Sequence, residues 1–123
     1  METTMDTTTI DTYLAAWNET DAERRAQLVE QAWSAEGTYV DPMLEATGRA
    51  GIAEMAAGVH AAYPGHQFRR TTQIDGHHDL VRFGWELVAP DGTITVAGID
   101  VAELDEDGRL RSVAGFFGDI PRR

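Results

Sequence analysis

The first group that could do chemistry is the aspartate in the middle of the apolar stretch 96–104. β-Branched and small apolar residues flank Asp100 on both sides, so a strand through this stretch would place the carboxyl group in the interior. An isolated buried charge is unfavourable, and a buried carboxyl group usually keeps its proton instead. Asp100 is therefore a candidate for acid–base chemistry. The alternative is an aspartate that accepts hydrogen bonds in the core or faces solvent on a bulged strand.

Two further side chains could complete such a site. Asp41 ends the short β-prone stretch 38–41, because Pro42 removes a donor of the strand ladder. Tyr13 shares one face of a predicted helix with Trp17. Each has a plainer interpretation, since Asp-Pro is a common turn and a tyrosine at helical spacing commonly packs in the core.

Apolar residues recur at helical spacing in three segments of the first half of the chain. The second segment opens with a capping box and is predicted to end at Gly37, and the third ends at residues 64–65, Pro-Gly. Residues 43–48 are predicted to form a loop. The predicted helices cover residues 10–17, 20–36 and 52–63.

From Gln67 onward the apolar pattern changes to a period of two, which is typical of strands. Turn signals at residues 75–76, 90–92 and 107–108 separate four strands of an antiparallel meander. The order along the chain is three helices followed by this meander.

The sheet is predicted to be strongly curved. Gly84, Gly98 and Gly115 lie inside neighbouring strands, where glycines often mark bulges or bends. A straight strand over residues 93–104 would extend about 40 Å, too long for a domain of this size. The predicted fold is α+β, with three N-terminal helices packed in the concave face of a strongly curved, mostly antiparallel sheet: a cone-shaped, cystatin-like roll with a pocket inside.

Strand parity predicts which side chains line that pocket. The inward faces carry Asp100 together with large apolar residues of the flanking strands, and the helices add their own apolar faces. Such a wall suits a hydrophobic, flat or polycyclic small molecule. An ordinary core role remains the alternative for these side chains, above all for Trp33 and Met55. The predicted wall consists of Trp17, Trp33, Met55, Val59, Phe83, Trp85 and Phe117.

The opposite face of the sheet is more apolar than a solvated face needs to be. We expect it to form a homodimer interface, since twofold contacts are the commonest closed symmetry. The alternative is that the C-terminal residues 118–123 cover this face. The predicted outer residues are Ile99, Val101, Leu110, Ala114 and Phe116.

Composition limits the class of protein. With 123 residues, 42% of them hydrophobic, and a net charge of −11, the chain fits one acidic globular domain, which we assign to residues 9–118 between a disordered tail at 1–8 and a short tail at 119–123. The negative charge argues against nucleic-acid and anionic-membrane partners, and no apolar run suits a membrane span. Without cysteines or a signal-peptide pattern, we expect a cytoplasmic protein.

The histidines and one arginine allow other interpretations. His77 and His78 could bind a metal, but adjacent residues in a hairpin turn point apart and no third ligand is evident, so we expect exposed turn residues and no metal. His60 and His66 could be general acids at a cavity mouth, with surface or capping roles as the alternative. A hydrolase site with an arginine between two carboxylates is disfavoured, because Arg82 alternates to the face opposite Phe83.

Taken together, these motifs resemble the nuclear transport factor 2-like superfamily, specifically its ketosteroid isomerase and SnoaL-like polyketide cyclase members. The resemblance spans about residues 10–118. It implies that Asp41 is the general base, and that Tyr13 and a protonated Asp100 form the oxyanion hole. The motifs that carry it are Tyr13, Asp21, Tyr39-Val40-Asp41-Pro42, Gly48-Arg49, Gly98-Ile99-Asp100-Val101 and Asp107-Gly108-Arg109-Leu110.

The resemblance implies a small enzyme, without a cofactor, that transfers a proton next to a carbonyl group. Trp33 and Ala56 stand where the isomerases place tyrosines that support the oxyanion hole, which argues against steroid isomerisation itself. The superfamily also has non-catalytic members, so a cavity protein that binds an apolar metabolite is the alternative function. The two differ at Asp100, which a binder could exchange for asparagine with little loss.

Overall fold

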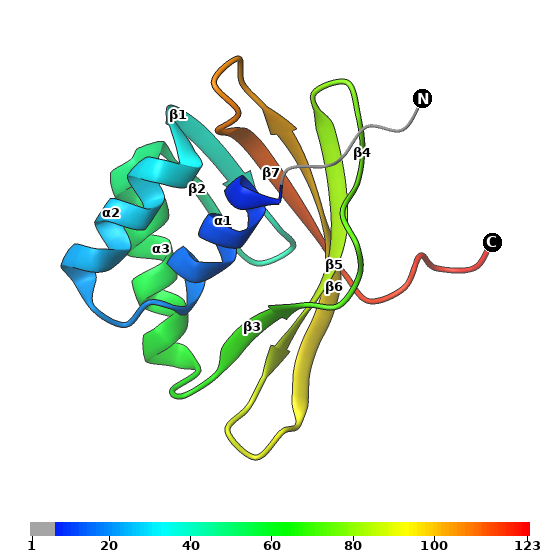
Figure 1. The fold of residues 1–123 in the computed structure, drawn as a ribbon. Helices are drawn as coiled ribbons and strands as arrows, with labels where there is room; N and C mark the ends of the chain where they lie inside the picture. Colours follow the sequence, from blue (N-terminus) through cyan, green and yellow to red (C-terminus); the bar gives the residue numbers. More distant parts are fainter. Residues whose placement is uncertain (1–6) are drawn as a thin grey trace.

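A computed structural model describes residues 7–123 as three helices against one curved sheet (Figure 1). The predicted tail 1–8 falls mostly outside the described residues, and the first helix already begins at Thr8. The helices are α1 (Thr8–Asn18), α2 (Ala22–Ala32) and α3 (Gly48–Ala62). The strands are β1 (Trp33–Val40), β2 (Glu45–Thr47), β3 (Gln67–Arg70), β4 (Asp75–His77), β5 (Leu80–Val88), β6 (Ile94–Leu104) and β7 (Leu110–Phe117).

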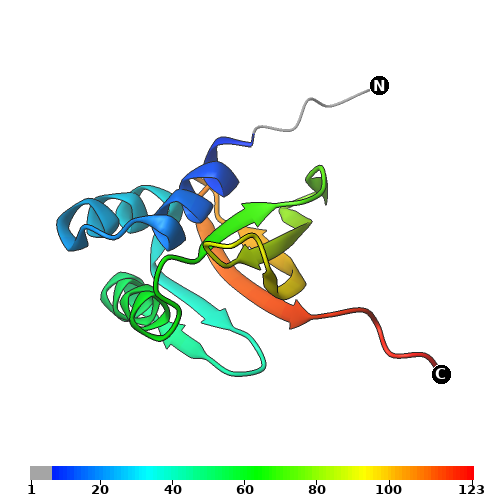
Figure 2. The same cartoon turned by 90° about the horizontal axis from the view of Figure 1, so that it is seen from below.

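The strands form one seven-stranded sheet in the order β2-β1-β7-β6-β5-β3, with β4 paired to β5. Only β1 and β7 run parallel; the other pairs are antiparallel. Figures 1 and 2 show the helices on one side of the sheet, with the long strands β5, β6 and β7 curving behind them. The predicted α+β roll is therefore confirmed.

Helix α2 is shorter than predicted. Asp21 caps it by accepting a hydrogen bond from the Arg24 backbone N–H at 2.8 Å, one residue after Thr20, where the predicted capping box places the cap. The helix ends at Ala32, and Trp33 is the first residue of β1. Gly37, predicted to end the helix, lies in β1 instead, where a Cβ atom would stand 2.5 Å from the Trp33 ring. This glycine makes room for an indole and does not cap a helix.

Two short strands also depart from the prediction. Residues 45–47, predicted to be part of a loop, form β2 and pair with β1. The turn predicted at residues 75–76 lies in β4, and the reversal comes at His78, which has a positive φ of 53°. Both strands have three residues, too few for a periodic signal to identify.

The central glycines serve close packing. The pairing of Gly98 with Trp85 and Phe117, and of Gly115 with Asp100, is in continuous register. Of the bulges or bends predicted at these glycines, no bulge is present in the described strands; the register shifts lie at Leu87/Val88, Glu103/Leu104 and, between β1 and β7, at Trp33/Thr38. A Cβ atom at Gly98 would stand 2.7 Å from the Trp85 ring, so glycine here admits a large side chain onto the concave face.

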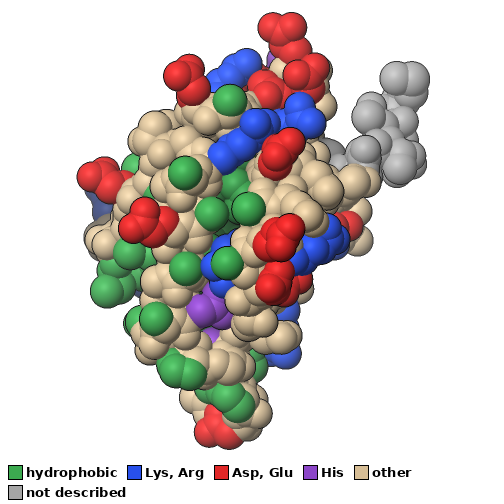
Figure 3. Space-filling model, turned by 90° about the vertical axis from the view of Figure 1, so that its left-hand side faces the viewer, with side chains coloured by type: hydrophobic (Ala, Val, Ile, Leu, Met, Phe, Trp, Pro, Cys, Tyr) green, Lys and Arg blue, Asp and Glu red, His purple; other side chains and the backbone are tan. Residues whose placement is uncertain are grey.

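The core lies between α1, α2 and the concave face of the sheet. Its largest fully buried side chains are Trp33, Tyr13, Leu110, Val29 and Val113. The prediction that Leu110 faces outward is wrong, because the register shift at the end of β6 turns it into the core. Figure 3 views the helical side, where apolar side chains lie among acidic and basic groups. Within residues 7–123, no helix is both long and apolar enough to cross a membrane.

Candidate active site

The fold brings the two predicted carboxyl groups together beside Gly115. Asp100 in β6 pairs with Gly115 in β7, and Asp41 follows β1, which runs parallel to β7. A Cβ atom at Gly115 would lie 3.0 Å from Asp100 Oδ1 and 3.2 Å from the Cβ atom of Asp41. Asp41 and Asp100 are therefore neighbours on the concave face, and a residue larger than glycine would press between them.

Asp100 is buried, with only 3% of its surface exposed. The Tyr13 hydroxyl donates to Asp100 Oδ2 at 2.7 Å, and the Trp85 indole N–H donates to Oδ1 at 2.9 Å. Burial raises the pKa of Asp100 to about 6, while these two donors act in the opposite direction and nearby Asp41 adds a smaller upward effect. The predicted direction is correct, but the protonated form predominates only below about pH 6.

Tyr13 is held in the core by α1 and by aromatic neighbours. Its ring lies 5.9 Å from that of Trp33 and 6.1 Å from that of Phe83 between centroids. Burial, and then the negative charge of Asp100, raise the pKa of Tyr13 well above its ordinary value. Tyr13 therefore stays a neutral phenol that can donate one hydrogen bond.

Asp41 is only partly buried and accepts three hydrogen bonds. The Tyr39 hydroxyl donates to Oδ2 at 2.7 Å, and the backbone N–H groups of Met43 and Leu44 each donate to Oδ1 at 2.8 Å. Burial, followed by the charges of Asp100 and Asp41, raises the pKa of Tyr39. A strand end, a tight loop and a phenol thus fix the orientation of the Asp41 carboxylate.

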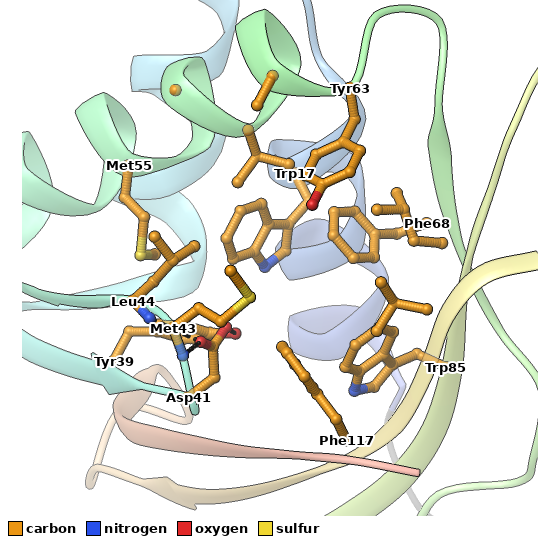
Figure 4. A pocket seen from close by; sticks show the side chains of 15 residues that line it. Trp17, Tyr39, Asp41, Met43, Leu44, Met55, Tyr63, Phe68, Trp85 and Phe117 are labelled. Atoms are coloured by element: carbon orange, nitrogen blue, oxygen red, sulfur yellow. Dashed lines mark hydrogen bonds between the residues drawn. The ribbon is translucent and has the colours of Figure 1, made fainter.

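Asp41 borders a cavity of about 400 Å³ between the concave face, α1 and α3 (Figure 4). Five of the seven predicted wall residues line it: Trp17, Met55, Val59, Trp85 and Phe117. Trp33 and Phe83 do not; both are core residues that pack against Tyr13. The predicted helix 20–36 places Trp33 on the wall, and strand parity places Phe83 there, but parity alone cannot separate wall residues from core residues.

Tyr13 and Asp100 lie behind this cavity and do not line it. They border a second void of about 10 Å³, enough for about one oxygen-sized atom. Four aromatic residues line both spaces, which therefore adjoin: Trp17, Tyr39, Phe68 and Trp85. The predicted base thus faces the cavity, while the two predicted donors face the small void.

Several wall residues were not predicted, chiefly Tyr39, Tyr63 and Phe68. Tyr39 could have been found, because alternation along the strand places it on the same face as Asp41 two residues later. Phe68 is positioned by Asn18, whose side chain both donates to the Phe68 carbonyl and accepts from its N–H, at 2.8 and 2.7 Å. The sequence carries no local signal for this contact across 50 residues.

The remaining polar candidates serve the scaffold. His60 Nε2 donates to the Trp17 carbonyl at 2.6 Å, near the end of α1, and His66 Nε2 lies 2.9 Å from Thr95 Oγ1. The capping alternative thus describes His60. His77 and His78 are exposed, but their rings are in contact, with Nδ1 atoms 3.1 Å apart, and do not point apart as predicted.

Two arginines, Arg82 and Arg49, also serve the scaffold. Arg82 is exposed and pairs with Asp75 at 2.8 Å, on the convex side of the sheet. Arg49 binds the Trp33 carbonyl through Nε and an Nη atom at 3.0 and 2.8 Å, which ties α3 to the start of β1. Within the described part of the chain, no cluster of three His, Cys, Asp or Glu residues is arranged to hold a metal ion.

Comparison with known proteins shows the family to which the chain belongs. A family model described as SnoaL-like domain matches residues 10–113. The chain belongs to the SnoaL-like family. This family lies within the nuclear transport factor 2-like superfamily, and structures described as NTF2-like share the fold. Among the curated proteins, none matches the chain significantly.

Three solved structures illustrate the relationship. A SnoaL-like family protein from Agrobacterium tumefaciens str. C58, provisionally named an isomerase, is 44% identical, with a TM-score of 0.87 over 91% of this chain and 96% of that one. A protein from Jannaschia sp. CCS1, provisionally named a SnoaL-like polyketide cyclase, is 13% identical, with a TM-score of 0.69 over 95% and 90% of the two chains.

The third is a protein with a ketosteroid isomerase-like fold from Catenulispora acidiphila DSM 44928, in complex with trimethylamine. It is 19% identical, with a TM-score of 0.71 over 89% of this chain and 85% of that one. The structures from Jannaschia and Catenulispora bear on the fold alone, whereas the Agrobacterium protein shares the family.

Proposed function

We propose that this protein is a small enzyme, working without a cofactor, that transfers a proton next to a carbonyl group of an apolar substrate. The observation that carries the proposal is an apolar cavity with a carboxylate, Asp41, on its wall and an oxygen-sized void behind it, bordered by Tyr13 and Asp100. In this assignment the carbon skeleton occupies the cavity and the carbonyl oxygen enters the void. Isomerase and cyclase are the provisional names of two related structures.

The reaction begins with removal of a C–H proton by Asp41. The C–H electron pair moves into a new carbon–carbon double bond, the carbonyl becomes an enolate, and the proton binds an Asp41 oxygen. The enolate oxygen is stabilised by donors fixed in position beforehand, commonly the largest electrostatic contribution. Return of the proton from Asp41 to another carbon completes an isomerisation. In a cyclisation the enolate carbon instead attacks a second carbonyl of the same molecule, and the resulting alkoxide oxygen takes the proton back from Asp41.

The donors must be Tyr13 and the protonated form of Asp100. An ionised Asp100 accepts the Tyr13 hydrogen bond and leaves no donor for the substrate, whereas a protonated Asp100 can donate to the Tyr13 oxygen and free the phenol hydrogen. Because the pKa of Asp100 is raised to about 6, this donor pair is populated on the acidic side of neutrality. Turnover should therefore fall as the pH rises through about 6.

Deuterium exchange tests the proposal without a known substrate. A panel of apolar cyclic ketones and 1,3-diketones is incubated with the protein in D₂O at an acidity equivalent to pH 5.5, and loss of the C–H signals next to the carbonyl is followed by ¹H NMR. Exchange should exceed the buffer rate for at least one ketone, and Asp41→Asn should lower the enzymatic rate about 10²- to 10⁴-fold.

Asp107→Asn is the matched control, because it removes the same charge from an exposed turn at the far end of β6. This variant should keep the wild-type rate. A wild-type protein that binds these ketones in the cavity but exchanges none of their protons above the buffer rate would contradict the proposal.

The alternative function is binding without turnover, and one observation favours it. Both oxygens of Asp100 already have internal partners, the Tyr13 hydroxyl and the Trp85 indole N–H. A pure binding protein would bind the same apolar ligands with nearly unchanged affinity after Asp41→Asn or Asp100→Asn. Calorimetric titration of both variants, beside the exchange experiment, separates the two functions.

A further inference from the structure

The cavity wall contains a continuous series of aromatic rings in mutual contact. The centroid of the Trp17 ring lies 5.5 Å from that of Tyr39 and 5.1 Å from that of Phe68. The series continues from Phe68 to Trp85 at 5.6 Å and from Trp85 to Phe117 at 5.9 Å. All five rings border the cavity (Figure 4), so an occupant is surrounded by π-systems on several sides.

The electrostatic character of the same cavity is negative. Asp41 is the only charged side chain among its described lining residues, which include no Lys, Arg or His. The neighbouring Asp100 is close behind the wall. The three ion pairs of residues 7–123 lie elsewhere and involve neither carboxyl group. The two acidic groups beside the cavity are therefore not neutralised by a basic side chain.

Aromatic faces and an uncompensated carboxylate both favour a positive charge. A cation over the face of Trp, Tyr or Phe is attracted by the ring quadrupole, and the attraction grows when water is excluded. A carboxylate in a partly desolvated site adds a Coulombic attraction that depends on the sign of the ligand charge. A quaternary ammonium group is weakly hydrated, so it loses little on entering such a wall, whereas an anion meets repulsion from Asp41.

We infer that the cavity preferentially binds hydrophobic organic cations, with an ammonium group near Asp41 and an apolar body against the aromatic rings. The inference concerns the cavity of the proposed enzyme but does not rest on turnover. It adds a charge preference to the apolar preference that the sequence predicts. An amine ligand would bind as a substrate that carries the charge or as a competitor for the cavity.

Three probes of similar shape and different charge test the inference. Benzyltrimethylammonium is the cation, neopentylbenzene is its neutral carbon isostere, and phenylmethanesulfonate is an anion of similar size. Binding is followed through tryptophan fluorescence, since Trp17 and Trp85 line the cavity, and dissociation constants are confirmed by calorimetry. The cation should bind at least tenfold more tightly than the neutral isostere, and the anion should bind most weakly.

Two variants test whether the preference for the cation comes from Asp41. Asp41→Asn should remove most of the preference for the cation while leaving affinity for neopentylbenzene within about twofold, and Asp107→Asn should retain the wild-type preference. Equal binding of cation and isostere by wild-type protein, or tighter binding of the sulfonate, would overturn the inference. This result is independent of proton exchange, because the wild-type comparison requires no reaction.

Discussion

Among single residues, Asp41 and Asp100 have the same type of side chain but different surroundings. The sequence predicted burial for Asp100 and a strand-end position for Asp41, and both are found. It could not predict how far burial would be offset, because the opposing donors come from Tyr13, 87 residues away, and from the Trp85 indole. These partners leave the pKa of Asp100 at about 6, so the protonated form that the predicted donor role requires predominates only on the acidic side of neutrality.

The first prediction follows from that pKa. The pKa of Asp100 in the folded protein, about 6, lies above the ordinary aspartate value of 3.8, so the carboxyl group contributes stability fully below about pH 4 and loses it as the pH rises through 6. Relative to Asp100→Asn, the wild-type free energy of unfolding should fall by up to about 3 kcal/mol from pH 4 to 7. Urea denaturation at intervals across this range measures it, and parallel stability curves would contradict it.

The substitution Tyr39→Phe tests whether the Tyr39 hydroxyl holds the proposed base, Asp41, in position. It removes one of three donors to Asp41 while the Met43 and Leu44 N–H groups remain. The free energy of unfolding should therefore fall by about 1–2 kcal/mol. Proton exchange should slow with little change in ligand affinity. Tyr63→Phe is the control, since Tyr63 lines the same cavity and is not among the described hydrogen-bond donors to Asp41. Equal effects of the two variants would exclude a positioning role for Tyr39.

At the scale of elements, the sequence predicted the three helices and the change to strands, and missed boundaries that depend on contacts. Trp33 continues the apolar pattern of α2, yet it begins β1, where Gly37 of the same strand leaves space for its ring. The helical spacing of apolar residues along the sequence does not predict this packing. The consequence for the site was direct, because Trp33 on a strand belongs to the core and not to the cavity wall.

Helix α3 offers an independent stability test beside the cavity. Gly58 lies inside this helix, and a Cβ atom there would meet no atom within 4 Å. Because alanine loses less conformational entropy than glycine in a helix, Gly58→Ala should stabilise the protein by about 0.5–1 kcal/mol. Thermal unfolding measures the change. A destabilised variant would show that the α3 backbone at Gly58 is held by something other than regular helix.

At the scale of the whole molecule, the convex face of the sheet has no partner among residues 7–123. Ile99 pairs with Phe116 across β6 and β7, and Phe116 is 60% exposed. The ion pairs Arg82–Asp75 and Glu103–Arg111 lie beside the apolar patch formed by Ile99 and Phe116. Each pair contains one positive and one negative group, so two copies can approach here despite the net charge of −11. We propose a twofold dimer through this face.

Sedimentation at high micromolar concentration should show this dimer. Phe116→Asp places a charge in the middle of the patch and should give monomers, whereas Ile120→Asp adds the same charge on the C-terminal segment, where Ile120 is 87% exposed, and should leave the dimer intact. A wild-type monomer at these concentrations would rule out the interface.

A crystal structure with a 4-alkylphenol, whose phenolate resembles an enolate, tests whether the cavity and the small void form one substrate site. If Asp41, Tyr13 and Asp100 form one site, the ligand ring occupies the cavity beside Asp41. Its oxygen then enters the small void, within about 2.5–3.0 Å of the Tyr13 hydroxyl or an Asp100 oxygen. A ligand whose oxygen points instead toward Met43 at the cavity mouth, while Tyr13 and Asp100 keep their hydrogen bonds only to each other and to Trp85, would show that the three residues do not form one site.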